Sequence, residues 1–214
     1  MASQVLVKKY NFDLSPATIR AEMKNLDEED LLAQPHHSAG RVPTTKAYRL
    51  FVDELLKEKK LKPKDEEKIT KRLKEVDHNK VFSHQLAQIL ADFSHNLGFS
   101  GFFGGQQTDF HEAGLPWLFE DEELREPDTL VDILRGFDAL EREFAYFFEE
   151  IEKETEIFIG EENPFKDLER CSLVVSGYKK KGKKGFIGIL GPKRMDYARN
   201  IFLVKEIKKI IENI

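Results

Sequence analysis

The fold of the first part of the chain is decided by residues 15–53, SPATIRAEMKNLDEEDLLAQPHHSAGRVPTTKAYRLFVD. Ser15 can cap a helix by accepting a hydrogen bond from an early backbone N–H. Pro16 suits the first helical position, where its missing N–H is not needed. Apolar residues then recur at spacings of four and three, and together they form one buried stripe: Ile19, Met23 and Leu26. The pattern predicts an amphipathic helix that begins at Pro16.

The opposite face of this helix carries small residues and cations instead of bulky apolar groups: Ala17, Arg20, Ala21 and Lys24. A helix that lies in the major groove of DNA can present such a face. Thr18, near the helix start, can donate to a phosphate with the help of the unpaired backbone N–H groups there. An ordinary solvated helix shows the same residue types, so the helix alone leaves both interpretations open.

A turn-rich segment follows the helix. The acidic run Asp27–Asp30 ends its basic face, and Gly40 supplies the backbone freedom that a tight hairpin needs. The tip of this hairpin carries two imidazoles and a guanidinium, within the run His36, His37, Ser38, Ala39, Gly40 and Arg41. Thr45 is expected to cap the helix that comes next.

The hairpin tip has the chemistry of a DNA contact. Arg41, with His37 and Ser38 before it, can grip the phosphate backbone or enter the minor groove. A hydrated loop is the alternative for the histidines, and a metal site is not expected because no further His or Cys lies nearby at ligand spacing. A helix followed by a basic hairpin is the order of a winged helix-turn-helix, so double-stranded DNA is the predicted partner.

Composition favours a cytoplasmic protein and gives no sign of an enzyme. The 214 residues contain no apolar run long enough to span a bilayer, and the start lacks a basic-then-apolar leader. The single cysteine, Cys171, sits in a strand-like apolar run and reads as a buried structural thiol. We find no nucleophile–base pair, metal cluster or phosphate loop, so neither a catalytic residue nor a cofactor is expected.

Charge is distributed unevenly along the chain. The formal net charge is −5, yet residues 109–162 hold 19 acidic and 4 basic residues, whereas residues 166–214 hold 13 basic and 5 acidic ones. Residues 1–60 are near neutral, with 10 basic and 9 acidic residues. Phosphate contacts from such a segment are few, so one copy should bind DNA weakly, and a homodimer on a symmetric site is expected.

The changes in charge along the chain predict three regions. These are a winged-helix DNA-binding domain over residues 1–61, a connector over 62–80 and an α+β domain over 81–214. Helices are expected at 69–76, at 81–97 with Gly98 as the stop, at 127–154, and at 195–214. A turn is expected at 115–118. The expected strands are 99–105, 156–159, 172–178 and 185–190, with a lysine hairpin at 179–184 between the last two.

Two further motifs carry a resemblance. Phe158–Asn163 (FIGEEN) leads to Cys171–Val174 (CSLV), and Gly188–Tyr197 reads GILGPKRMDY. With residues 15–53, they resemble the HrcA family of heat-inducible transcription repressors over most of the chain. The resemblance implies a GAF-like second domain that pairs subunits, an inverted-repeat operator upstream of chaperone genes, and the chaperonin GroEL as a partner.

Three departures from that family are expected to matter. The usual first helix, which would precede Ser3, is missing, and an inserted dimerisation subdomain is missing between about Leu97 and Gly104. Ala21 stands where the family commonly has a polar residue such as asparagine, which can bond adenine bidentately. The domain after the winged helix-turn-helix is therefore a reduced GAF-like α+β domain.

Alternatives remain for the function and for one motif. A dimerising or ligand-sensing GAF-like module with a degenerate DNA-binding head is the second hypothesis beside the repressor. Glycines recur every third residue from Gly182 to Gly191, but this spacing is not a dinucleotide fingerprint. The segment Gly191–Arg194 before the last helix can bind an anion or simply face solvent.

Overall fold

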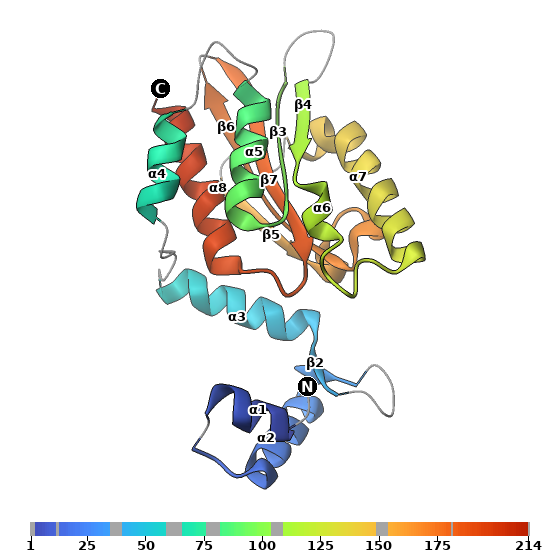
Figure 1. The fold of residues 1–214 in the computed structure, drawn as a ribbon. Coiled ribbons are helices and arrows are strands. Elements are labelled where there is room, and N and C mark those ends of the chain that lie inside the picture. The colour runs from blue at the N-terminus through green and yellow to red at the C-terminus, as the bar shows by residue number, and fades with distance from the viewer. Residues whose placement is uncertain are drawn as a thin grey trace. The chain divides into compact units, whose positions relative to one another are not determined.

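The computed structural model describes residues 3–11, 13–34, 40–58, 66–75, 82–103, 109–148, 154–180 and 182–213. The chain divides into two compact units, Met1–Lys57 and Glu58–Ile214 (Figure 1). No helix within these described ranges has the length and apolar character needed to cross a membrane.

The first unit consists of helices and one short ribbon. Its elements are α1 (Ser3–Tyr10), α2 (Pro16–Glu28), β1 (Leu32–Ala33), β2 (Val42–Pro43) and α3 (Thr45–Glu58). The strands β1 and β2 pair antiparallel, with Leu32 opposite Pro43 and Ala33 opposite Val42. A ribbon of two residue pairs is too short to be stable alone, so its orientation depends on what holds its ends.

Helix α2 begins where the sequence predicts. Ser15 is its N-cap and Pro16 its first residue. Ile19 is buried and Met23 half-buried, but Leu26 is 38% exposed, so the predicted stripe is wrong at its last member. A unit of this size has few apolar groups with which to cover the end of a helix.

The cap of α3 differs from the prediction. Thr45 is already the first residue of the helix, and the hydroxyl of Thr44 accepts from the N–H of Ala47 at 3.2 Å. The backbone carbonyl of Thr44 also accepts from the N–H of Tyr48. Thr44 therefore caps α3, one residue earlier than expected.

The second unit is built on a five-stranded antiparallel sheet in the order β4-β3-β7-β6-β5. The strands are β3 (Leu97–Phe103), β4 (Asp109–Ala113), β5 (Thr155–Ile159), β6 (Cys171–Lys180) and β7 (Lys183–Pro192). The helices are α4 (Glu66–Lys74), α5 (Phe82–Ser94), α6 (Leu115–Leu118), α7 (Pro127–Phe148) and α8 (Tyr197–Glu212). Two 3₁₀ turns, Gly160–Glu162 and Lys166–Leu168, separate β5 from β6. The α+β prediction is confirmed.

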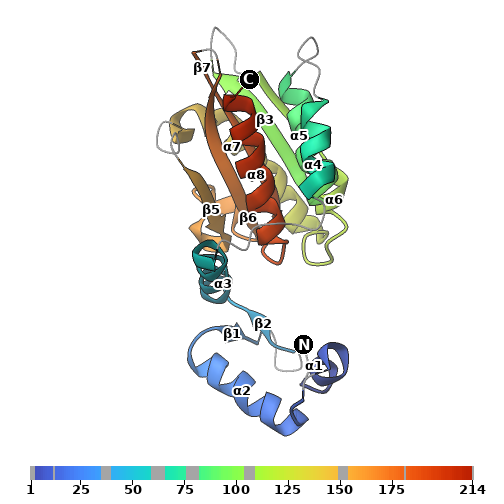
Figure 2. The same cartoon turned by 90° about the vertical axis from the view of Figure 1, so that its left-hand side faces the viewer.

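Helices cover both faces of this sheet (Figures 1 and 2). Side chains alternate along each strand, so Leu97 and Phe99 point to the face that packs against Phe137 and Leu140 of α7. The opposite face lies under α5 and α8. Gly98 lets α5 approach closely, because a Cβ there would lie 2.5 Å from the carbonyl oxygen of Ala87.

Two local predictions in this unit were wrong, and one strand was missed. Gly98 lies inside β3 and does not stop α5, which ends at Ser94 and reverses through His95 with a φ of 54°. Residues 115–118 form α6 instead of a turn, and β4 was not predicted. Each of these depends on packing against the rest of the unit, which local sequence patterns do not encode.

The C-terminal hairpin and helix agree better with the sequence. Lys179 lies opposite Lys184 across the predicted lysine hairpin. Asp196 caps α8 by accepting from the N–H of Arg199 at 3.1 Å. The helix begins at Tyr197, two residues after the predicted start at Met195. The four residues predicted to face inward are buried: Ile201, Val204, Ile207 and Ile211.

Candidate nucleic-acid interface

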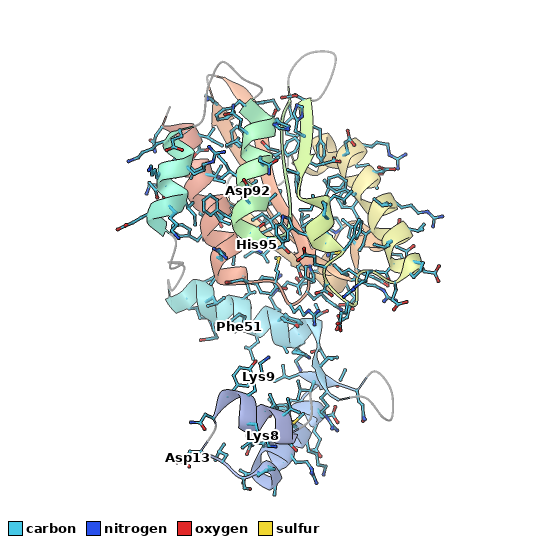
Figure 3. The ribbon with its side chains drawn as sticks, viewed as in Figure 1. Lys8, Lys9, Asp13, Phe51, Asp92 and His95 are labelled. Atoms are coloured by element: carbon cyan, nitrogen blue, oxygen red, sulfur yellow. The ribbon has the colours of Figure 1, made fainter. Side chains whose placement is uncertain are left out.

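The exposed face of α2 is the candidate site. All four side chains predicted for this face are exposed, namely Ala17, Arg20, Ala21 and Lys24, and so is Thr18 near the helix start. Ile19 points to the other side and is buried. The side chains of both units are drawn in Figure 3. The helix therefore presents small residues and cations together, without a large apolar group among them.

The start of α2 is organised by two hydroxyls. The Oγ atom of Ser15 accepts from the backbone N–H of Thr18 at 3.1 Å and lies 2.9 Å from the Oγ1 atom of Thr18. The first turn of α2 contains no acidic residue. The positive end of the helix dipole is therefore not offset by a carboxylate in that turn, which favours an anion there.

Lys24 has one ion pair on the surface of α2. Its Nζ atom lies 3.2 Å from Glu28 Oε1, and the two side chains are 74% and 64% exposed. Pairs with this exposure contribute little, because water screens them and both side chains lose conformational freedom. A phosphate can replace Glu28 as the partner of Lys24 at small cost.

Arg41 immediately precedes β2, at the loop end of the ribbon, and contacts α2. Its Nη2 atom donates to Asp27 Oδ2 at 2.7 Å, and the side chains are 28% and 34% exposed. The hydrogen bond from Arg41 lowers the pKa of Asp27, and the same bond raises the pKa of Arg41. The other two residues predicted in the hairpin, His37 and Ser38, lie outside the described residues.

Further contacts join the end of α2 to the segment after the ribbon. Thr44 donates through its hydroxyl to the carbonyl of Asp30 at 2.7 Å and through its backbone N–H to the carbonyl of Leu31 at 3.1 Å. Lys46 donates to the carbonyl of Glu29 at 2.7 Å. We call this set the α2 latch: Asp27, Glu29, Asp30 and Leu31 on one side, with Arg41, Thr44 and Lys46 on the other.

Sequence reasoning missed the α2 latch. One signal was present, because the acidic run Asp27–Asp30 stands at the helix end where the dipole is negative and carboxylates are unfavourable. Such a run needs cations nearby, and Arg41 and Lys46 are the basic residues that follow it in sequence. Their pairing with the run depends on the chain folding back, which spacing alone does not give.

The motif FIGEEN followed by CSLV stabilises a turn in the second unit. The Nδ2 atom of Asn163 lies within 2.8–3.1 Å of the carbonyls of Gly160, Leu168 and Cys171. Burial raises the pKa of the Cys171 thiol to about 12, so the thiolate that a nucleophile needs does not form near neutral pH. The prediction that this cysteine is buried is confirmed.

The cations of the segment Gly191–Arg194 face carboxylates. Arg194 Nε lies 2.7 Å from Asp121 Oδ2, and Lys193 Nζ lies 3.8 Å from Glu161 Oε1. The hydroxyl of Tyr197 donates to the carbonyl of Lys193 at 2.6 Å. These contacts support a structural role for this motif and argue against the anion site considered from the sequence.

One polar cluster in the second unit needs to be distinguished from a catalytic triad. Asp109 contacts Ser83 Oγ at 2.5 Å and His111 Nε2 at 2.8 Å. The acid thus lies between the serine and the histidine, whereas a nucleophilic triad places the histidine in the middle. Across the described parts of the chain, no group of three or more His, Cys, Asp or Glu residues is arranged to hold a metal ion.

The protein thus belongs to a class in which a small helix-and-ribbon unit, with an exposed cationic helix, precedes a larger α+β unit. The family described as HrcA protein C terminal domain matches residues 45–201, which is most of the chain. The chain belongs to the HrcA family.

Individual relatives agree with this assignment. A heat-inducible transcription repressor HrcA from Natranaerobius thermophilus is 29% identical over 308 residues, which covers 97% of this chain and 88% of that protein. Another from Geobacter sulfurreducens is 40% identical over 99 residues, covering 46% of this chain and 29% of that protein. The match of 308 residues is longer than this chain of 214, so the Natranaerobius protein has residues within the matched region that this chain lacks.

A solved structure shares the fold. It is described as a hypothetical protein at 2.2 Å resolution, with a TM-score of 0.75 and 17% sequence identity. The match covers 100% of this chain and 92% of that one. At this identity the similarity supports the fold alone.

Proposed function

We propose that this protein is a transcriptional repressor, as its relatives are named, and that it binds double-stranded DNA through a winged helix-turn-helix. The observation that carries the proposal is the exposed face of α2, on which Arg20 and Lys24 stand among alanines. The ribbon that follows α2 supplies the wing. This order of parts matches the winged helix-turn-helix, whose second helix enters the major groove.

Each side chain on α2 has a distinct role in this proposal. Arg20 and Lys24 reach base edges or phosphates in the major groove, while Ala17 and Ala21 allow close approach and can contact thymine methyl groups. Ser15 and Thr18 approach a phosphate at the helix start.

The wing contributes a second set of contacts in this proposal. His37 and Ser38 contact the phosphate backbone from the wing tip.

The second unit is proposed to join two copies. Residues 1–61 would form the DNA-binding domain, residues 62–80 the connector, and residues 81–214 a reduced GAF-like dimerisation domain. A dimer doubles the small number of phosphate contacts that one α2 offers, which matters because each contact adds to a salt-dependent affinity. An inverted repeat is the operator that such a dimer reads. Family resemblance suggests chaperone genes as targets and GroEL as the partner that maintains the repressor.

A ligand-sensing module is less well supported. The sheet face under α7 is filled by aromatic rings, with centroids 6.0 Å apart for Phe99 and Phe110 and 5.6 Å apart for Phe110 and Phe137. A Cβ on Gly188 would lie only 2.2 Å from the ring of Phe99. Dense packing of this kind leaves the face poorly suited to a small molecule.

The proposal is tested by selecting binding sites from a random duplex library with the full chain, then measuring affinity for the selected duplex. Arg20→Ala should weaken binding about 10-fold to 100-fold, since one good base contact contributes about 1–3 kcal/mol. Lys205→Ala removes an exposed lysine of α8 in the second unit and is the matched control, with affinity unchanged. Failure to select any duplex, or equal affinities for wild type and Arg20→Ala, would contradict the proposal.

A further inference from the structure

We infer that the α2 latch is a positioning device for the wing, and that Arg41 acts on DNA binding through Asp27 instead of through a phosphate. This inference rests on the proposed function, because it assigns roles within the same winged helix-turn-helix. The sequence position of Arg41 suggests a direct contact with DNA, whereas here Arg41 holds the ribbon against α2.

The ribbon needs an external support. Only Leu32 with Pro43 and Ala33 with Val42 pair across β1 and β2. Two such pairs do not fix the direction in which a hairpin points. The α2 latch spans this weak region, because Asp27 lies before β1, and Arg41 immediately precedes β2.

The contacts of the α2 latch are short and differ in kind. Arg41 makes a charged hydrogen bond of 2.7 Å to Asp27, which is stronger than a neutral one. Thr44 and Lys46 each donate at 2.7 Å to backbone carbonyls that follow the last turn of α2, where carbonyls have no partner within the helix. Asp30, one of these acceptors, has a φ of 58°, a left-handed conformation that aspartate tolerates better than most residues.

Electrostatics explains why the cations sit there. Four acidic residues follow one another from Asp27 to Asp30, at the negative end of the helix dipole. Arg41 and Lys46 place positive charge against this end. Without these cations, the acidic run would be destabilised by the negative end of the helix dipole, and it would repel an approaching phosphate.

Arg41 is poorly placed to serve DNA directly. Its side chain is 28% exposed, compared with 74% for Lys24, and its guanidinium is held by Asp27. Moving Arg41 onto a phosphate would leave the carboxylate of Asp27 without its cation and close to another negative charge. The geometry therefore favours a guanidinium that stays on Asp27 while DNA is bound.

The test compares Asp27→Asn with Glu28→Gln, two isosteric changes that each remove one negative charge from the last turn of α2. Without the α2 latch, both variants should bind the selected duplex equally to wild type or more tightly, because a repulsive charge is lost. The inference predicts that Asp27→Asn weakens binding about 3-fold to 10-fold, whereas Glu28→Gln does not weaken it. Binding by Asp27→Asn that is equal to or tighter than that of the wild type would overturn the inference.

The salt dependence of binding by Arg41→Ala gives a second readout. A lost phosphate contact lowers the slope of log affinity against log salt by about one, whereas a lost positioning contact weakens binding with the slope unchanged. A slope reduced by about one for Arg41→Ala would show a direct phosphate contact and overturn the inference.

A measurement without DNA separates this inference from the proposed function. Amide hydrogen exchange at Ala33 and Val42 should quicken about 10-fold in Asp27→Asn and stay at the wild-type rate in Glu28→Gln. Equal exchange rates in both variants would contradict the α2 latch even if the wild type binds DNA. Faster exchange in Asp27→Asn together with a wild type that binds no DNA would contradict the proposed function and leave the α2 latch supported as a structural device.

Discussion

The two units bury their apolar residues in different ways. In the second unit, a continuous core joins both ends of the sheet to α7, and Val131 and Leu134 are its exposed large apolar residues among those described. In the described part of the first unit, Ile19 and Val52 are the buried apolar residues. Six large apolar side chains there are exposed: Val5, Tyr10, Leu14, Leu26, Leu50 and Phe51.

The comparison indicates what holds each unit together. Burial stabilises the second unit in proportion to the apolar area removed from water. The first unit buries less and relies more on polar contacts, namely the Ser15 cap, the Thr44 cap and the α2 latch. We therefore expect mutations of apolar residues to act strongly on the second unit and changes of charge to act on the first.

The largest effect is expected for Phe99→Ala in the core of the second unit. Phe99 is fully buried and meets Phe110, Phe137 and Phe186. Truncation should lower the free energy of unfolding by about 3–5 kcal/mol, measured by urea denaturation. The control is Phe51→Ala on α3, labelled in Figure 3, which is 55% exposed and should change stability by less than about 0.5 kcal/mol. Similar losses from both would break the comparison.

A smaller effect is expected for Gly98→Ala. The added Cβ would lie 2.6 Å from the Cβ of Leu90 and 2.5 Å from a backbone oxygen of α5, so helix and sheet must separate. Overpacking of this kind costs about 1–3 kcal/mol in thermal or urea unfolding. Gly182→Ala is a useful contrast, because nothing lies within 4 Å of the added Cβ there, although its φ of +79° is itself unfavourable for alanine. An unchanged stability for Gly98→Ala would show that α5 does not pack as described.

Next in size is the loss of the α2 cap. Ser15→Ala removes the acceptor of the Thr18 N–H and should cost about 1 kcal/mol of stability in the first unit, seen as reduced helicity by circular dichroism. Ser15→Asp retains an acceptor and should keep most of that stability. The assignment of the cap fails if the two variants behave alike.

The smallest effect expected is a pH dependence of the α2 latch. Arg41 holds the pKa of Asp27 below its ordinary value of 3.8, so the pair stabilises the first unit above that pH. This stabilisation is lost as pH falls further, through the lowered pKa of Asp27. Protection of the Val42 amide, which is its exchange rate relative to the intrinsic rate at the same pH, should therefore fall below about pH 4 in the wild type. In Asp27→Asn the same amide should show low protection at every pH, and a wild-type response in this variant would point to another group.

Local signals in the sequence were sufficient for some elements. Ser15 and Pro16, which are adjacent in sequence, determine where α2 begins. The helical spacing of the apolar residues in α8 identifies its buried side, formed by Ile201, Val204, Ile207 and Ile211. The cationic face of α2 follows from the same periodicity. In these places the residues that decide the structure are neighbours in sequence.

Other features depend on residues distant in sequence. Strand β4 forms because it pairs with β3 and packs under α5, and Gly98 is placed by contact with α5. Arg41 looked like a wing-tip contact because nothing local reveals Asp27, 14 residues earlier, as its partner. Sequence patterns of period 2 or 3.6 do not carry such information.

The most direct test of the central claim is chemical protection of guanine N7 in the selected duplex. Guanine N7 lies in the major groove, where α2 is proposed to bind. The wild type and Lys205→Ala should protect the same guanines from methylation, and Arg20→Ala should lose protection at one or more of them under saturating protein. An identical protection pattern for Arg20→Ala, or a wild type that protects no guanine N7, would contradict the claim that the exposed face of α2 reads DNA.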